Sequence, residues 1–258
     1  MSTSLAERLA GGEKLFTAWS SVPDALTVEI VAGQGFDAVT LDMQHGGHHE
    51  DSVVRSIAPV LAAGRHAIVR IPVGRFDMAS RALDFGAEAV IAPMVNSVED
   101  ARRFAEAMNY PPVGRRSWGP TFAMPRRGPA GAQDWLRSQN RATTAFAMIE
   151  TREALAALDD ILAVPGIDGV FVGPSDFSIA WSEGAAIDPG LDAMMEAIAD
   201  IAARAARAGK MAGIYVVDPA LCGRFAAMGY GLFALGSEHV YMALGIETLL
   251  GAARQSMR

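Results

Sequence analysis

The stretch TAFAMIETREALAALDDILAVPGIDGVFVGPSD, residues 144–176, decides the fold. Its two short apolar runs, at 144–149 and 169–172, are typical of buried strands, and the segment 152–163 between them has the pattern of a helix. Gly166, just before the second run, suits the end of a helix that leads into the next strand. The stretch is therefore predicted to form one β-α-β unit with parallel strands.

The same alternation of strand and helix patterns runs through all 258 residues. Near-continuous apolar strands indicate burial on both faces, as in a parallel sheet covered by helices. Eight such units without a Pro/Gly-rich linker favour an α/β fold of the (β/α)8 TIM-barrel type over an open doubly wound sheet, and one domain over residues 1–258. The predicted strands are 15–19, 37–42, 67–71, 89–92, 144–149, 169–172, 212–216 and 232–235, and the predicted helices include 24–32, 51–63, 76–85, 97–108, 152–163 and 191–208.

Composition excludes several classes of protein. A chain that is 51% hydrophobic and 20% charged is too apolar to be disordered, and its net charge of −7 argues against a nucleic-acid partner. The longest uncharged run, 225–237, is too short to cross a membrane, and no targeting segment stands out. The single cysteine, Cys222, cannot form an internal disulfide, so we expect a cytoplasmic protein.

Polar residues follow five of the predicted strands at their carboxyl ends, where TIM barrels carry their active sites. Trp19 ends the first strand, and the second leads into the segment DMQHG, residues 42–46. Arg70 lies at the end of the third strand, Glu150 follows the fifth, and GPSD, residues 173–176, follows the sixth. Charged groups are costly to bury singly, so we expect these side chains to act together.

Two of these residues, Glu150 and Asp176, are candidate ligands for a divalent metal. Hard carboxylates without cysteine suit Mg2+ or Mn2+, with water or substrate oxygens completing the coordination. The alternative is that both carboxylates form ion pairs with arginines of the barrel. A zinc site at His45, His48 and His49 is less favoured, because adjacent histidines point in different directions.

The remaining strand-end residues each have two interpretations. The turn Gly173-Pro174-Ser175 can hold a carboxylate or phosphate by backbone N–H groups, although such turns are common. Arg70 can bind a substrate carboxylate or a developing oxyanion, or it can pair with Asp42 or Asp84. His45 can serve as a general base near neutral pH or have a structural role.

Lysine is scarce in this chain, which bears on the mechanism. Of the 22 basic residues only Lys14 and Lys210 are lysines, and both precede predicted strands. Side chains at strand starts face the end of a barrel opposite the active site. A Schiff-base mechanism is therefore disfavoured, and a metal-stabilised enolate is the alternative.

The sequence resembles the HpcH/HpaI aldolase family, the metal-dependent class II pyruvate aldolases typified by 4-hydroxy-2-oxoheptanedioate aldolase. The matching segments occur in order and span nearly the whole chain. They are GFD (35–37), DMQHG (42–46), VRIP (69–72), DFGA (84–87), APMV (92–95), YPPVGRR (110–116), IETR (149–152) and GVFVGPSD (169–176).

The resemblance implies reversible cleavage of a 4-hydroxy-2-oxo acid to pyruvate, or a related 2-oxo acid, and an aldehyde. It implies that Glu150 and Asp176 bind the metal, which would be Mg2+ or Mn2+ with Co2+ as an alternative. It also implies a homo-oligomer, a hexamer built as a trimer of dimers. The implied substrate contacts and catalytic residues are Gly173, Pro174 and Ser175 at the pyruvate carboxylate, Arg70 at the enolate oxygen, Trp19 in the pocket wall, and His45, supported by Asp42 and Asp84, in proton transfer.

This chain departs from many family members at two positions. Gln44 stands where many have glutamate, and Met148 stands where some have glutamine. Neither position is a predicted metal ligand. The departures bear on the acceptor aldehyde and on the basicity of His45 more than on the type of reaction.

Three other functions remain open from the sequence. One is a carbon–carbon lyase acting on an acyl-CoA thioester of the malyl-CoA type, for which the arginine-rich segment 110–131, predicted to be a long loop, could contact phosphates. Another is a non-catalytic barrel that binds a 2-oxo acid. The least favoured is chemistry on phosphoenolpyruvate.

Overall fold

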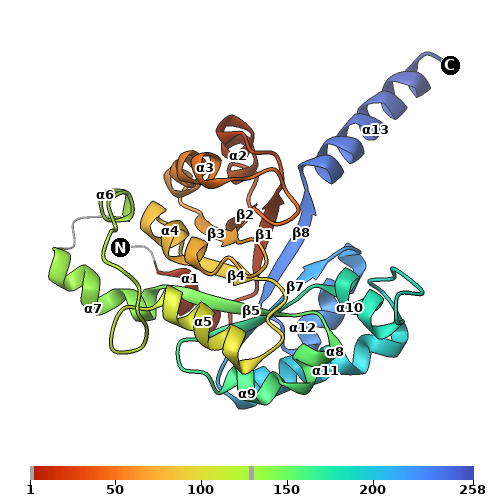
Figure 1. Ribbon diagram of the computed structural model, residues 1–258. Coiled ribbons are helices and arrows are strands. Elements are labelled where there is room, and N and C mark those ends of the chain that lie inside the picture. Colours follow the sequence, from red (N-terminus) through yellow and green to blue (C-terminus); the bar gives the residue numbers. More distant parts are fainter. Residues whose placement is uncertain (1–2, 128–130) are drawn as a thin grey trace.

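The computed structural model describes residues 3–127 and 131–258 and forms a closed barrel of eight parallel strands in the order β1 to β8. The TIM-barrel prediction is therefore confirmed, with every strand within two residues of its expected bounds. Helices surround the barrel, and each strand is hydrogen-bonded to the strands before and after it in the chain (Figure 1). The strands are β1 Leu15–Ser20, β2 Ala38–Asp42, β3 His66–Arg70, β4 Ala89–Ala92, β5 Thr144–Ile149, β6 Gly169–Val172, β7 Met211–Val216 and β8 Leu232–Ser237.

The helices follow the expected βα alternation, with additions that the sequence pattern did not reveal. The predicted helix 152–163 is two short helices divided at Ala157, where no helix breaker stands in the sequence. The helices are α1 Leu5–Ala10, α2 Ala25–Ala32, α3 Glu50–Ala62, α4 Asp77–Phe85, α5 Val98–Met108, α6 Ala123–Arg127, α7 Ala132–Ala142, α8 Arg152–Ala156, α9 Leu158–Leu162, α10 Pro174–Trp181, α11 Asp192–Arg207, the short 3-10 helix Pro219–Leu221, α12 Cys222–Met228 and α13 Glu238–Ser256.

The segment 110–131 corrects one expectation, because its described part includes helix α6. Arg126, on that helix, donates to the carbonyl oxygens of Phe85 and Val54 at 2.6 and 2.7 Å. These two bonds hold α6 against α4 and α3. Tertiary contacts of this kind are not visible in a local pattern, so proline and glycine content alone suggested an irregular loop; residues 128–130 lie outside the described residues.

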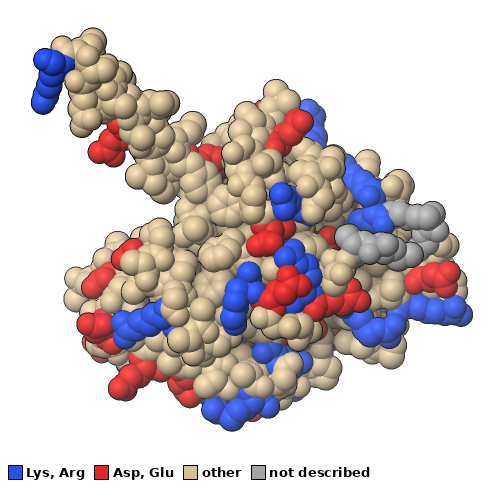
Figure 2. Space-filling view, turned by 180° about the vertical axis from the view of Figure 1, so that it is seen from behind, with Lys and Arg blue, Asp and Glu red and all other residues tan. Residues whose placement is uncertain are grey.

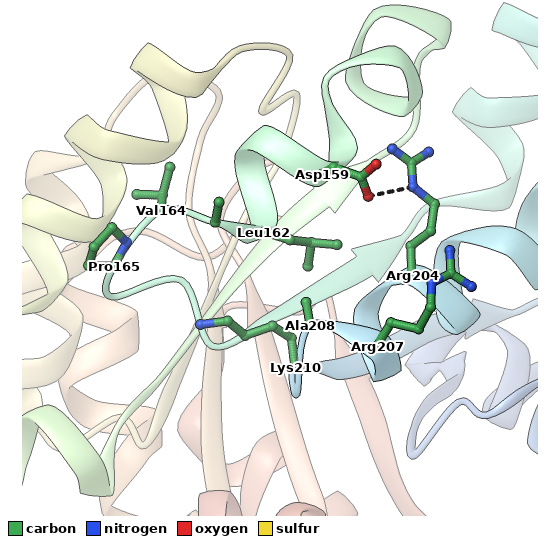
Figure 3. A pocket seen from close by; sticks show the side chains of 9 residues that line it. Asp159, Leu162, Val164, Pro165, Arg204, Arg207, Ala208 and Lys210 are labelled. Carbon is green, nitrogen blue, oxygen red and sulfur yellow. Dashed lines mark hydrogen bonds and ion pairs between the residues drawn. The ribbon is translucent and has the colours of Figure 1, made fainter.

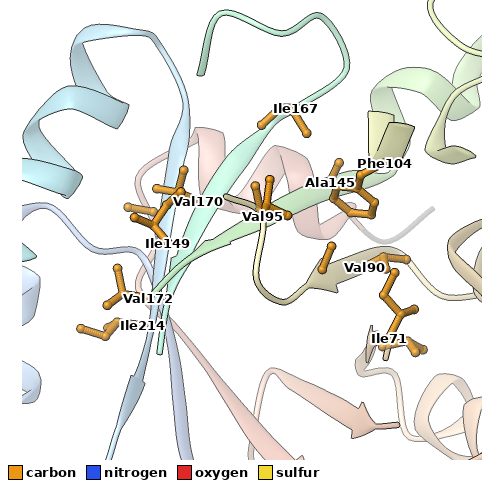
Figure 4. Close-up of a cluster of buried hydrophobic side chains, with 14 of the residues drawn as sticks. Ile71, Val90, Val95, Phe104, Ala145, Ile149, Ile167, Val170, Val172 and Ile214 are labelled. Carbon is orange, nitrogen blue, oxygen red and sulfur yellow. The ribbon is translucent and has the colours of Figure 1, made fainter. Parts of the chain in front are cut away.

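Apolar side chains fill two layers, one inside the barrel and one between the barrel and its helices. Inside, the rings of Phe146 and Phe171 fit because their neighbours Gly169 and Gly213 have no side chain. A Cβ at either glycine would lie 2.7 Å from the adjacent ring. Part of the outer layer, around Val90, Ala145 and Phe104, is drawn in Figure 4. Because both faces of the sheet are buried, the strands read as unbroken apolar runs.

Helix α1 closes the end of the barrel at which the strands begin. Leu5 and Leu9 are buried and belong to the interior apolar cluster. The backbone N–H of Leu5 donates to Glu88 Oε2 at 3.1 Å. The opposite end, where the strands finish, therefore remains the open one.

Helix α13 projects away from the barrel (Figure 1). Its base is held by Glu238, which accepts hydrogen bonds from the Ser20 hydroxyl at 2.5 Å and the Ser21 N–H at 2.8 Å. Beyond that base, apolar side chains such as Leu244 and Leu249 are exposed. Among the described residues no helix is long and apolar enough to span a membrane.

Candidate active site

A cleft of about 300 Å³ opens at the carboxyl ends of the strands. It brings together most of the residues that the sequence analysis named at strand ends. A separate, larger groove lies between α9 and α11 (Figure 3), but Lys210 at the start of β7 places it at the other end of the barrel. The residues that line the strand-end cleft are Trp19, Ser21, Asp42, His45, Arg70, Met148, Phe171, Gly173, Pro174, Ser175, Asp176, Tyr215 and Ser237.

Asp42, the last residue of β2, organises one wall of the cleft. Arg70 on the adjacent strand β3 donates to both carboxylate oxygens, with distances of 2.8 Å from Nε and 2.6 Å from Nη2. Trp19 Nε1 donates to Oδ2 at 3.1 Å. Burial alone would raise the pKa of the Asp42 carboxyl, but these donors and the Arg70 charge hold that pKa below its usual value. Asp42 is therefore a carboxylate that orients its neighbours.

Arg70 pairs with Asp42, one of the two partners that its sequence position allowed. Its partner is Asp42, which holds the guanidinium in a fork of two hydrogen bonds. The guanidinium also lies 4.8 Å from the centre of the Trp19 ring, and it lines the cleft. An arginine fixed in this way presents a positive charge to the cleft without having to rearrange.

Glu150 lies just past the end of β5 and is not among the residues that line the cleft. Its Oε1 accepts the Met94 N–H at 2.8 Å, while its Oε2 is buried and has no hydrogen-bond partner among the described residues. Burial, and to a smaller extent the nearby charge of Asp176, raise the pKa of Glu150 to about 7. A Cβ at Gly173 would lie 2.5 Å from Oε2, so a larger residue at position 173 would collide with that oxygen.

Two backbone features near Glu150 serve the site. Met94 adopts a φ of 53°, which is uncommon for a residue with a side chain and directs its N–H to Glu150. Helix α10 begins at Pro174 with no side chain capping its first turn. The N–H groups of that turn are therefore free to hold an anion, although Pro174 itself has none.

The metal hypothesis fits this geometry. A buried carboxylate oxygen without a donor, next to a second carboxylate at Asp176, is costly unless a proton or a cation is present. No cluster of three or more His, Cys, Asp or Glu occurs in residues 3–127 and 131–258, so the protein would supply two ligands. Such an open site suits a hard divalent cation that keeps water or substrate oxygens.

Among the described residues of one chain, no hydrogen bond joins His45 to Asp84. The His45 backbone N–H donates to Asp42 Oδ1 at 3.3 Å, but its imidazole ring forms no hydrogen bond with Asp42 or Asp84 among the described residues. Asp84, on α4, pairs with the buried Arg116 at 2.6 Å and does not line the cleft. The cleft therefore contains His45 without a carboxylate partner from the described part of its own chain.

The zinc alternative has no support from the other two histidines. His48 is buried and lies within hydrogen-bond distance of Ser20 and Ser52, at 3.0 and 3.1 Å. Burial lowers its pKa to about 4, so its ring is neutral and bridges two hydroxyls. His49 starts helix α3 outside the cleft.

Two aromatic residues of the cleft were not anticipated. Tyr215 on β7 packs edge-on against Trp19, with ring centres 5.3 Å apart, and the ring centre of Phe171 on β6 lies 5.9 Å from that of Trp19. Tyr215 belongs to the seventh strand, whose end shows no charged motif. The alternation Gly213-Ile214-Tyr215 was the available signal, because inward-facing positions recur at every second residue of a strand.

The chain is similar in sequence to proteins named as aldolases. A hydroxypyruvate/pyruvate aldolase from Roseovarius nubinhibens is 35% identical over 235 residues, 91% of this chain and 90% of that protein. A 4-hydroxy-2-oxo-heptane-1,7-dioate aldolase from Salmonella arizonae is 32% identical over 96% of this chain and 94% of its own length.

The fold comparison points the same way. An HpcH/HpaI aldolase/citrate lyase family protein from Burkholderia cenocepacia superposes with a TM-score of 0.85 at 26% identity, over 97% of this chain and 98% of that one. The family model for HpcH/HpaI aldolase/citrate lyase matches residues 15–243. The chain therefore belongs to the HpcH/HpaI aldolase/citrate lyase family.

Proposed function

We propose that this carbon–carbon lyase is a divalent-metal-dependent aldolase that reversibly cleaves a 4-hydroxy-2-oxo acid to pyruvate, or a related 2-oxo acid, and an aldehyde. One observation carries the proposal above all. Glu150 Oε2, which has no hydrogen-bond partner among the described residues, lies next to Asp176 and to the first turn of α10, which no side chain caps. A cation could bind at the two carboxylates, and the carboxylate group of a substrate could bind at the turn beside them. The aldolases to which the chain is similar support this reaction.

Glu150 and Asp176 would hold the metal, Mg2+ or Mn2+ with Co2+ as an alternative. When bound, the metal would polarise the carbonyl group of the 2-oxo acid and make its methyl group more acidic. Glu150 would be ionised in this state, because a neighbouring cation favours the charged form of a carboxyl.

The other residues would bind the substrate and move its proton. The N–H groups of Gly173 and Ser175, with Pro174 shaping the turn, would hold the carboxylate of the 2-oxo acid. Arg70, oriented by Asp42, would stabilise the negative oxygen of the enolate as it develops. His45 at the rim would accept the proton, and Trp19 would form the floor of the pocket. Asp84 does not line the cleft of its own chain, so within that chain it would support the proton transfer without touching the substrate.

The acyl-CoA alternative loses the feature that motivated it. None of the four arginines of segment 110–131 lines the cleft. Arg116 pairs with Asp84, while Arg126 and Arg127 border a cavity next to α1, at the closed end of the barrel. Among the described residues, no cluster of lysines or arginines lies at the strand ends to bind the phosphates of coenzyme A.

The proposed reaction has a direct test in deuterium oxide. The purified protein with Mn2+ is expected to exchange the methyl protons of pyruvate for deuterium, as followed by proton NMR, and to lose this exchange when the metal is chelated. A protein that only binds 2-oxo acids would exchange nothing. An enzyme acting on phosphoenolpyruvate would instead release phosphate from it.

The same sample can exclude a lysine imine. Lys14 Nζ donates to the Tyr230 carbonyl and Lys210 Nζ to the Ile167 carbonyl, both outside the cleft. Borohydride added with pyruvate is therefore expected to leave the mass of the protein unchanged. Covalent trapping on either lysine would contradict the proposal.

The apolar surface of α13 supports a homo-oligomer in which a second copy covers this helix. Most of the projecting helix is neither acidic nor basic (Figure 2), and Leu244 and Leu249 are 59% and 73% exposed. Exposed Leu26 and Ile30 on α2 provide a further apolar surface. Patches of this kind are normally buried by association. We propose the family's hexamer, a trimer of dimers, in the cytoplasm, with small-molecule substrates as its other partners.

Assembly is expected to depend on the apolar residues of α13. Wild type should elute as a multiple of the 27.2-kDa chain, and Leu244→Asp combined with Leu249→Asp should give a smaller species in light scattering. Glu247→Lys, on the same helix, is the matched control and should keep the wild-type mass. A monomeric wild type would contradict the proposal.

A further inference from the structure

A second cavity of about 250 Å³ adjoins the catalytic cleft on the side of β7. It shares Pro174 and Tyr215 with the cleft, so these two residues form the boundary between the two spaces. Pro174 also begins the turn that would hold the carboxylate of the 2-oxo acid. If the proposed function holds, an aldehyde acceptor bound beside that acid has room to extend past Tyr215 into this cavity.

The Tyr215 hydroxyl is available as a donor at the boundary. It has no hydrogen-bond partner within the described residues, although its ring is packed against Trp19. Burial raises the pKa of the phenol, so the hydroxyl stays protonated at neutral pH. A fixed, protonated phenol that faces the cleft can donate to a carbonyl oxygen there.

The charge of the cavity limits what can enter it. Asp188 and Asp218 both line it, and neither forms an ion pair with a described residue. Each accepts one backbone N–H, from Gly190 and Ala220 at 3.0 and 2.9 Å, and retains capacity for further donors. No lysine or arginine lines the cavity. An acceptor that carries a carboxylate would therefore meet two like charges and no cation.

The rest of the lining limits the length and polarity of the acceptor. Val217, Leu221 and Phe225 also line the cavity and contribute apolar surface. The small volume suits a chain of a few carbon atoms. Hydroxyl groups on such a chain could donate to Asp188 or Asp218, which a purely aliphatic aldehyde could not do.

We propose that this cavity is the acceptor site of the aldolase, selecting short, uncharged hydroxyaldehydes over aldehydes that bear a carboxylate, and that Tyr215 donates a hydrogen bond to the acceptor's carbonyl oxygen. As the enolate carbon bonds to the carbonyl carbon of the aldehyde, the electrons of the C=O double bond move onto this oxygen, and the enolate reverts to a ketone. The Tyr215 hydrogen bond strengthens as that charge grows. A proton from solvent then converts the new alkoxide into the hydroxyl group.

The Tyr215 contribution can be separated from the enolate step. Tyr215→Phe is expected to lower kcat/KM for aldol addition of pyruvate to glycolaldehyde by tenfold or more, on the order expected for a lost oxyanion donor. Metal-dependent deuterium exchange into pyruvate, which needs no acceptor, should be retained. Equal loss of both activities, or no loss of either, would overturn the role of Tyr215.

The charge selection has its own measurement. Wild type is expected to prefer glycolaldehyde to 4-oxobutanoate in kcat/KM, and Asp188→Asn with Asp218→Asn should improve the rate with 4-oxobutanoate several-fold. Asp160→Asn, exposed on α9, is the control and should change neither substrate. A wild-type preference for 4-oxobutanoate would overturn the proposal.

The two proposals fail in different ways. If the wild type exchanges no pyruvate protons with any of the three metals, the proposed aldolase function is wrong and the acceptor site is wrong with it. If exchange occurs but the acceptor preferences differ from those above, only the acceptor site is wrong.

Discussion

Glu150→Gln is expected to lower kcat/KM for aldol cleavage by about a thousandfold or more, since a metal that stabilises an enolate contributes several kcal/mol. Glutamine keeps the shape of the side chain and can still accept the Met94 N–H, which Glu150 accepts at 2.8 Å. It removes the negative charge that would hold the cation. Steady-state kinetics at saturating Mn2+, with Mn2+ affinity from calorimetry, measure the effect.

Stability without metal gives an independent check on this variant. The pKa of Glu150 rises from 4.5 to about 7 on folding, so its contribution to stability is full below 4.5 and is lost as the pH rises through 7. At pH 8 the metal-free Glu150→Gln protein should therefore resist urea better than wild type. Glu153→Gln, exposed on α8, is the matched control. Unchanged Mn2+ affinity in Glu150→Gln would contradict the assignment of this ligand.

Arg70→Lys is expected to lower kcat by about a hundredfold to a thousandfold, the range seen when an oxyanion donor is removed. A lysine keeps the positive charge but cannot reproduce the two hydrogen bonds that Arg70 makes to Asp42, at 2.8 and 2.6 Å. Its ammonium group would also lose the planar contact with Trp19. The result is a cation that is no longer fixed at the enolate oxygen.

Pyruvate exchange and aldol cleavage should both fall in Arg70→Lys, because both pass through the enolate. This pattern differs from that expected for Tyr215→Phe, where exchange is retained. Arg75→Lys is the control, since Arg75 is exposed in the following loop and, among the described residues, forms an ion pair with Asp77 alone. An Arg70→Lys enzyme with wild-type exchange would show that Arg70 has only a structural role.

The residues that the sequence identified best are those whose role follows from chain position. Asp42, Arg70 and Asp176 come directly at or after apolar strands, and parallel strands of a barrel finish at one end. Their convergence in one cleft could therefore be predicted before any contact was known. Lys14 and Lys210 precede strands, so chain direction places both at the opposite end of the barrel, away from the cleft.

Side-chain partners were less predictable. Asp84 could have oriented either Arg70 or His45, and in the structure it pairs with Arg116, which is 32 residues further along the chain. From the sequence, any arginine of segment 110–131 could have bound a ligand. In the structure Arg126, on α6, donates to two backbone carbonyls instead. Local sequence does not carry these choices, because each depends on how separate helices pack.

The sequence by itself determined that this chain forms an eight-stranded parallel barrel and which end of it carries the chemistry. Both follow from periodicity and chain direction, which are local properties. The tertiary structure alone decided which oxygen of Glu150 lacks a partner, that Asp42 and Arg70 pair, and that Tyr215 separates the cleft from an acidic cavity. Those properties depend on burial and on distances between strands far apart in the chain, which are set only when the barrel closes.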